Sequence, residues 1–139
     1  MKTILHKAAT RGHADHGWLD TYHTFSFASY FNPERVHFGA LRVLNDDKVA
    51  PSEGFGMHPH QNMEVISIPL KGYLRHGDSI ENSSVITPGT LQVMSTGTVF
   101  TTANTTTALP SRSNSFRYGF SRKKRIPNPN TTTSTYGMR

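Results

Sequence analysis

Two histidines one residue apart, His58 and His60, are the residues whose type and spacing most clearly suggest chemistry in this 139-residue chain. They stand directly ahead of the apolar run 63–70. Side chains alternate between the two faces of a strand, so both imidazoles should point the same way. If the extension continues without a bulge, Glu64 shares that face. Imidazole suits Fe, Ni, Cu and Zn, and a carboxylate shifts the preference toward Fe or Mn. The spacing indicates half of a metal site, and the alternative is a pair of ordinary loop histidines.

The remaining histidines favour structural or solvated roles. Three lie in a polar N-terminal region and are expected to face solvent: His6, His13 and His16. His23 and His37 stand among aromatic residues, which favours hydrogen-bonded structural histidines. His76 precedes Gly77 and Asp78, which favours a role in a turn. No serine stands at a strand-to-helix elbow, so nucleophilic catalysis is not indicated.

The elements that would position the histidine pair are short strands separated by turns. Turn-prone residues occur at 45–47, 71–72, 77–78 and 88–89, and residues 51–56 have the composition of a loop. Candidate strands lie between them, at 40–44, 63–70, 73–76, 85–86 and 91–94. Strands at intervals of roughly 8–12 residues are typical of a β-sandwich or barrel. The sequence therefore predicts an all-β domain.

Composition limits the cell compartment and the partners. The chain has no cysteine, which excludes disulfides and thiolate metal ligands. No apolar run approaches the ~20 residues of a membrane span, and the N-terminus lacks a signal-peptide core. We therefore expect a cytoplasmic protein that does not associate with membranes.

Charge is divided unevenly along the chain. Residues 1–95 hold eight Lys or Arg and nine Asp or Glu, a net charge of −1, whereas residues 96–139 hold seven Lys or Arg and no acid. The second segment is rich in Thr, Asn and Ser and has few apolar residues, so we expect a disordered or irregular tail. Basic residues 122–125 follow the aromatic residues Phe116, Tyr118 and Phe120, a pattern that nucleic-acid binding can use. We do not favour a nucleic-acid partner, for a reason given below.

A set of motifs in one order resembles the N-terminal domain of pirin-family proteins. They are Phe25–Phe27, Tyr30–Pro33, Phe38–Asp47, Gly54–His60, Met63–Glu64, Leu74–Ser79 and Pro88–Ser95. The resemblance covers residues 1–98 and implies a cupin (jelly-roll) barrel, the incomplete N-terminal half of a bicupin. Residues 99–139 then form a separate basic tail.

The resemblance also implies a cofactor and an activity. A divalent metal, with iron preferred over Mn, Ni, Cu or Zn, would be held by His58 and His60 with a His and a Glu from a later G-x-G-x-x-H-S-E motif. Some members resemble quercetin 2,3-dioxygenases, which implies a flavonol-like aromatic substrate and O2. Others are regulators, so the alternative is a non-enzymatic metal-binding or redox-sensing protein that acts through a protein partner.

The second ligand motif is missing from the chain. Its His and Glu should fall at positions 102 and 104, which hold Thr102 and Asn104. Suitable codons for residues 99–108, read with one extra G in front, give G-V-Y-H-S-E-Y-N-N-S. Codons for 108–122 regroup to A-T-E-P-V-E-F-L-Q-I-W-V-F-P, which looks like the next family strand.

We therefore interpret residues 99–139 as the product of a frameshift after about residue 98, which makes the basic tail accidental. The expectations are weak metal binding, loss of the strands that close the first barrel, and little or no dioxygenase activity. Glu64 is an alternative third ligand, although a structural role for it is preferred.

Overall fold

Antiparallel strands form nearly all the regular structure of the protein. The computed structural model describes residues 3–78, 83–96, 100–106, 113–121 and 132–137. One short 3₁₀ turn, η1 (Ala8–Thr10), precedes the first strand. The strands are β1 (Gly12–Asp15), β2 (Leu19–His23), β3 (Leu41–Val49), β4 (Gly54–His60), β5 (Met63–Lys71), β6 (Leu74–Asp78), β7 (Ser83–Ile86), β8 (Thr90–Ser95), β9 (Phe100–Thr106), β10 (Ser113–Ser121) and β11 (Thr132–Gly137). The prediction of an all-β domain is confirmed.

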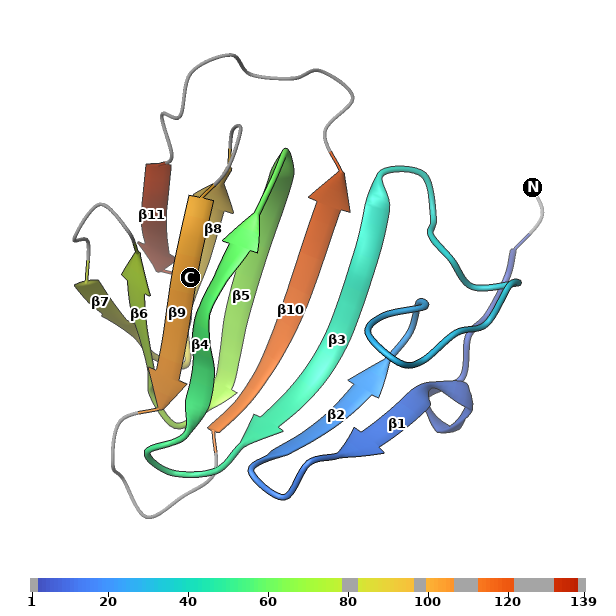
Figure 1. Cartoon of the computed structure of the whole chain (residues 1–139), viewed down its shortest axis with the longest axis horizontal. Coiled ribbons are helices and arrows are strands. Elements are labelled where there is room, and N and C mark those ends of the chain that lie inside the picture. Colours follow the sequence, from blue (N-terminus) through green and yellow to red (C-terminus); the bar gives the residue numbers. More distant parts are fainter. Residues whose placement is uncertain (1–2, 79–82, 97–99, 107–112, 122–131, 138–139) are drawn as a thin grey trace.

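Hydrogen bonds join these strands into two sheets (Figure 1). The larger sheet has the order β1-β2-β3-β10-β5-β8-β11, and the smaller has the order β4-β9-β6-β7. Strands that are distant in sequence are neighbours in both sheets, because β10 separates β3 from β5 and β9 separates β4 from β6. No helix among the described residues is long and apolar enough to span a membrane.

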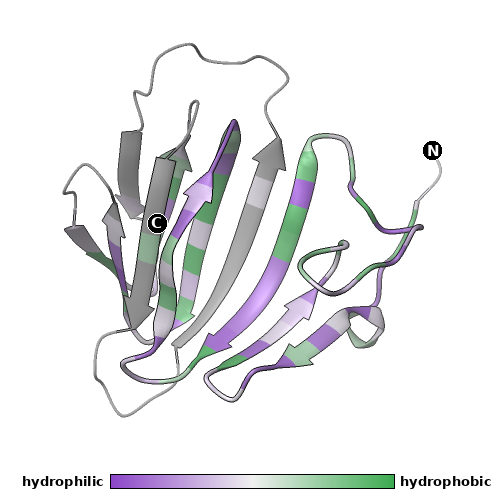
Figure 2. Ribbon diagram, in the orientation of Figure 1, coloured by the Kyte–Doolittle hydropathy of each residue, from purple (hydrophilic) through white to green (hydrophobic). Residues whose placement is uncertain are grey.

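A small apolar core lies between the sheets. From Ile66 onward, apolar residues alternate with more polar ones along β5, as expected for a strand with two different faces (Figure 2). The buried apolar side chains are Leu19, Phe25, Val49, Leu74, Ile86 and Met94. Thr96, fully buried after β8, both donates to the carbonyl of Met63 and accepts from its backbone N–H at 3.0 Å. These two bonds hold the end of β8 against the start of β5.

Three segments of the tail form regular strands, contrary to the expectation of a disordered or irregular tail. Residues 100–106, 113–121 and 132–137 form β9, β10 and β11. Two of these strands are internal members of the sheets: β9 pairs with β4 and β6, and β10 pairs with β3 and β5. Backbone hydrogen bonds from neighbouring strands do not depend on side-chain hydrophobicity, and Thr, Phe and Tyr all favour extended backbone.

The expected turn at Asn45, Asp46 and Asp47 is also wrong. These residues lie inside β3, which continues to Val49. Propensity alone favours a turn, but β3 is paired on both sides, with β2 and with β10. Tertiary pairing overrides the local preference of polar residues in this way.

Candidate metal centre

A cavity of about 310 Å³ lies between the two sheets and contains both candidate ligands. The larger sheet contributes residues from β2, β3, β5, β8 and β10, and the smaller sheet contributes residues from β4 and β6. About half of the lining residues are apolar, including Leu19, Val43, Val65 and Met94. A polar group inside such a space interacts strongly with any ligand that reaches it, because little water competes.

His58 and His60 lie close together at the end of β4. Both line the cavity, with ring centroids 4.7 Å apart and ring planes inclined at 69°. His58 Nδ1 donates to the carbonyl oxygen of Gly56 at 2.7 Å, which leaves Nε2 with its lone pair. A backbone carbonyl that fixes the ring through one nitrogen is the usual support for a metal-ligating histidine. The pair therefore has the donor chemistry for half of a coordination sphere.

Aromatic rings continue from the histidine pair toward the surface. The ring of Phe55, which also lines the cavity, lies 6.4 Å from that of His58. Trp18 contacts the edge of Phe55 with ring centroids 5.3 Å apart. The one tryptophan of the chain is therefore two ring contacts away from the candidate ligands.

Glu64 does not share the face of the histidine pair. A turn with a positive φ of 51° at Asn62 separates β4 from β5, and the two strands belong to different sheets. This turn breaks the alternation on which the expectation rested, so Met63, Val65 and Ser67 line the cavity instead. Glu64 accepts a hydrogen bond from Ser95 Oγ at 2.5 Å. This bond supports the preferred structural role, and Glu64 is not among the residues that line the cavity with the histidine pair.

Within the described residues, no group of three or more His, Cys, Asp or Glu side chains is placed to hold a metal. Strand β9 runs beside the histidine pair, and Thr102 is the cross-strand partner of His58. Asn104 pairs with Phe55 on β4 and with His76 on β6. The two positions at which the family motif would supply ligands therefore adjoin the cavity-lining strands.

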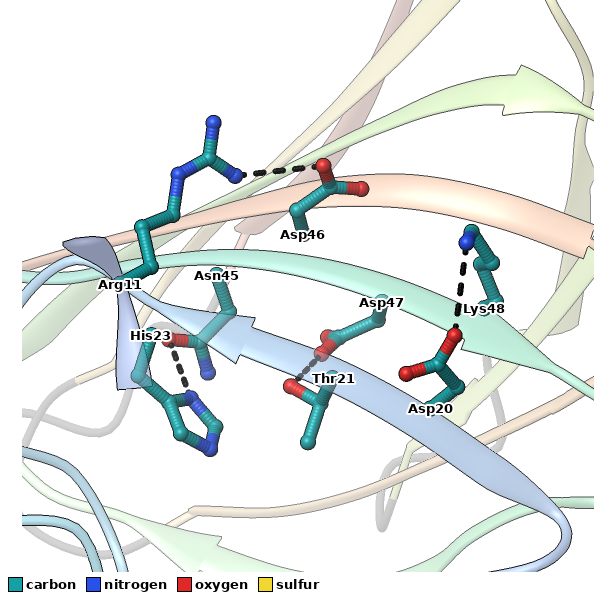
Figure 3. Close-up of polar contacts among 8 residues, drawn as sticks. All are labelled: Arg11, Asp20, Thr21, His23, Asn45, Asp46, Asp47 and Lys48. Carbon is teal, nitrogen blue, oxygen red and sulfur yellow. Dashed lines mark hydrogen bonds and ion pairs between the residues drawn. The ribbon is translucent and has the colours of Figure 1, made fainter. Parts of the chain in front are cut away.

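A row of polar side chains lies on the cavity face of β2 and β3 (Figure 3). Thr21 donates to Asp47 at 2.5 Å, and His23 Nδ1 lies 3.0 Å from Asn45 Oδ1. All four are buried, and all four line the cavity. The expectation that His23 is a hydrogen-bonded structural histidine is confirmed. Composition gave no signal for this row, although polar residues at every second position of β2 and β3 could have suggested it.

The outer face of the same strands carries ion pairs. Arg11 lies 3.2 Å from Asp46, and Asp20 lies 2.7 Å from His13 and 3.3 Å from Lys48. Burial raises the pKa of Asp20, but hydrogen bonds and charge attraction from His13 and Lys48 outweigh it, so the net pKa is below its ordinary value of 3.8. These pairs stabilise the β2–β3 ladder and take no part in the cavity.

The other histidines are distributed as follows. His6, His13 and His16 are exposed, as expected, although His16 also borders the cavity. His37 is exposed, so its predicted structural role is not supported. His76 is not in a turn, because it lies within β6, is 1% exposed and lines the cavity. Residues 122–125, the predicted basic patch, fall outside the described part of the chain.

Comparison with known proteins gives a consistent result. Residues 5–114 match the family described as Pirin. A curated relative named quercetin 2,3-dioxygenase from Escherichia coli K12 is 51% identical over 94 residues, 68% of this chain and 41% of the relative. A protein named putative quercetin 2,3-dioxygenase from Zymomonas mobilis is 55% identical over 87 residues, 63% of this chain and 37% of the relative.

Solved structures agree with the sequence relatives. The bacterial pirin YhhW from Escherichia coli, crystallised with nickel(II), has a TM-score of 0.90 and 36% identity, over 96% of this chain and 57% of that one. A quercetin 2,3-dioxygenase from Acinetobacter baumannii has a TM-score of 0.71 at 16% identity over 91% of this chain and 42% of that one, which bears on the fold alone. The chain spans about two fifths of the length of the curated relatives it matches.

Proposed function

The chain belongs to the pirin family, and from that premise we propose that His58 and His60 are two ligands of a divalent metal in a cavity suited to a flavonol-like substrate. The observation that carries the proposal is the histidine pair itself. Its rings lie 4.7 Å apart in the cavity, and His58 is oriented through Nδ1 by the carbonyl of Gly56.

The donor set determines which metals fit. Two neutral imidazoles suit Fe, Ni, Cu and Zn, and relatives of this chain include a pirin crystallised with nickel(II). The metal, when bound, would act as a Lewis acid toward a substrate oxygen and support O2 chemistry. The protein residues orient the ligands and exclude water. With half of the family's ligand set, this chain binds the metal weakly.

A frameshift after about residue 98 accounts for the missing half of the ligand set. In the restored reading, position 102 is His and position 104 is Glu. Position 102 pairs with His58, and position 104 pairs with Phe55 and His76, so both lie on the strand next to the histidine pair. This register supports the frameshift, because the restored ligands would fall beside the existing ones.

The restored sequence also suits β10. Its residues 113–121 read V-E-F-L-Q-I-W-V-F, over the same span as β10 in the structure. A strand paired on both sides normally carries β-branched and aromatic residues, which make up six of the nine residues in the restored reading and three of the nine in Ser113–Ser121. Position 117, Arg in this chain and Gln in the restored one, pairs with buried Asn45 and buried Ser67.

The coverage of the comparisons supports the same account. Sequence similarity to the two curated relatives above extends over 94 and 87 residues, and the family match ends at residue 114, whereas structural similarity to a pirin extends over 96% of the chain. A backbone that continues in the family's fold while the sequence departs from the family is what a shifted reading of related DNA would produce.

Two experiments test the proposal. The coding DNA should yield an H-S-E-containing frame when one base is restored near codon 98, and its absence would refute the frameshift. The frame-restored protein, loaded with iron or nickel, should consume O2 in the presence of quercetin, whereas the chain as written should show little or no turnover. Tight metal binding without turnover by the restored protein would favour a metal-binding regulator that acts through protein contacts.

A further inference from the structure

Gln92 occupies an unusual position on the cavity wall. It lies on β8, is 2% exposed and faces the cavity. Its cross-strand partner on β5 is Ser67, which is 3% exposed and also lines the cavity. A primary amide is therefore buried on the larger sheet, while the histidine pair lines the same cavity from the smaller sheet.

The amide nitrogen of Gln92 has no hydrogen-bond partner among the described residues. The polar pairs on β2 and β3 differ, because Thr21 is bonded to Asp47 and His23 to Asn45. A buried N–H that forms no hydrogen bond opposes folding, and such groups are rare in native proteins. A ligand in the cavity would complete the bonding of this donor.

The surroundings of Gln92 suit a flat, oxygen-bearing molecule. Met94 on the same strand and Val65 on the neighbouring strand offer apolar contacts, and Phe55 adds an aromatic surface from β4. These groups would cover the faces of an aromatic ring, whereas the amide nitrogen would donate to an oxygen at the edge of the ring. Pockets of this composition use a few polar groups to fix the orientation of the ligand.

We propose that Gln92 is a specificity-determining residue, whose amide nitrogen donates to a carbonyl or phenolate oxygen of the aromatic ligand. This inference rests on the proposed function, because it concerns the same cavity. It adds a contact on the opposite sheet from the candidate metal ligands. The ligand would then be held between the two sheets, by the metal at the histidine pair of the smaller sheet and by the Gln92 amide of the larger sheet.

The test compares Gln92→Met with a matched control, Leu91→Met, in the full chain. Gln92→Met keeps the size of the side chain and removes the donor, and Leu91→Met changes a residue of β8 that does not line the cavity. Thermal unfolding without ligand should show Gln92→Met as stable as the wild type or more stable, since the amide nitrogen has no bond to lose among the described residues. Quercetin affinity, measured by quenching of Trp18 fluorescence, should fall about five- to tenfold in Gln92→Met and change less than about twofold in Leu91→Met.

The possible outcomes separate the two proposals. Lower thermal stability of unliganded Gln92→Met would show that the amide has a structural role, and unchanged quercetin affinity in that variant would show that it does not touch the ligand. Either result overturns the role of Gln92 and leaves the metal proposal intact. If the wild-type chain binds neither quercetin nor catechol, both the substrate class and the role of Gln92 are wrong.

Discussion

Thr102 is the direct cross-strand partner of His58, on the strand that lies between β4 and β6. This pairing places a position at which the family motif would supply a ligand next to the proposed ligand His58. Directly opposed residues of an antiparallel pair have Cβ atoms about 4.5–5.5 Å apart, a separation from which two side chains can reach one metal ion. The backbone of the proposed site is thus present on both strands, and what this chain lacks is the residue identity at position 102.

The ring contacts between Trp18, Phe55 and His58 predict an optical signal for metal binding. A paramagnetic ion such as Cu²⁺ or Ni²⁺ at the histidine pair should quench the fluorescence of Trp18, the one tryptophan in the chain. His58→Ala should remove most of the saturable quenching, and His37→Ala, an exposed histidine elsewhere, should leave it unchanged. Equal quenching in His58→Ala and the wild type would place the ion elsewhere.

Asp20 predicts a pH dependence of stability. Its pKa is lowered in the folded protein, despite the opposing effect of burial, by His13 and Lys48. Because the pKa of Asp20 is lower in the folded protein than in the unfolded one, its ionised carboxylate stabilises the fold above the unfolded pKa. This stabilisation is lost as the pH falls through the folded pKa. Asp20→Asn should therefore lower the free energy of unfolding by about 0.5–1 kcal/mol near neutral pH. Below pH 3.8, the ordinary pKa of this carboxyl group, the difference in the free energy of unfolding between the wild type and Asp20→Asn should shrink.

Denaturant unfolding of the wild type and Asp20→Asn at several pH values measures this effect. Glu34→Gln is a suitable control, because Glu34 is exposed and lies away from the β1–β2 pair. A difference between wild type and Asp20→Asn that grows as the pH falls would contradict the assignment.

Position 117 predicts that one substitution in the tail stabilises the fold. It lies in the central part of the larger sheet, paired with buried Asn45 and buried Ser67. A charged residue at a central-strand position opposes folding unless it is paired, and the restored reading has an uncharged residue there, so Arg117→Gln should raise the melting temperature. Arg75→Gln, on the exposed side of β6, should change it little. A lower melting temperature in Arg117→Gln would show that the arginine is accommodated, which would weaken the case for a shifted frame.

The sequence predicted the parts of the fold that depend on local pattern. The apolar run that forms β5 and the segment Leu91–Met94 within β8 have strand patterns that need no partner to be recognised. The histidine pair was found because H-x-H on extended backbone places both rings on one side. Resemblance to the family then gave the order of the motifs and the kind of site.

The parts that the sequence did not predict depend on pairing between distant segments. Asn45 and Asp47 look like turn residues until Thr21 and His23 are known to lie opposite them. Glu64 appears to follow His58 and His60 on one strand, and only the turn at Asn62 moves it to another sheet. Nor does the composition of β9 and β10 reveal that partners on both sides hold them extended.

Metal titration of a variant with restored ligands tests the central claim most directly. In zinc-finger peptides, four ligands bind Zn²⁺ with a free energy of about 10–16 kcal/mol. Each ligand therefore contributes roughly a hundredfold to the affinity. Calorimetric titration with Ni²⁺ should therefore show one ion per chain in Thr102→His/Asn104→Glu, bound at least about a hundredfold more tightly than by the wild type. The shifted control Thr101→His/Ala103→Glu, which projects from the alternate positions of β9, should bind no better than the wild type. Equal affinities in the two double variants, or tight binding that survives His58→Ala and His60→Ala, would contradict a metal site built on this histidine pair.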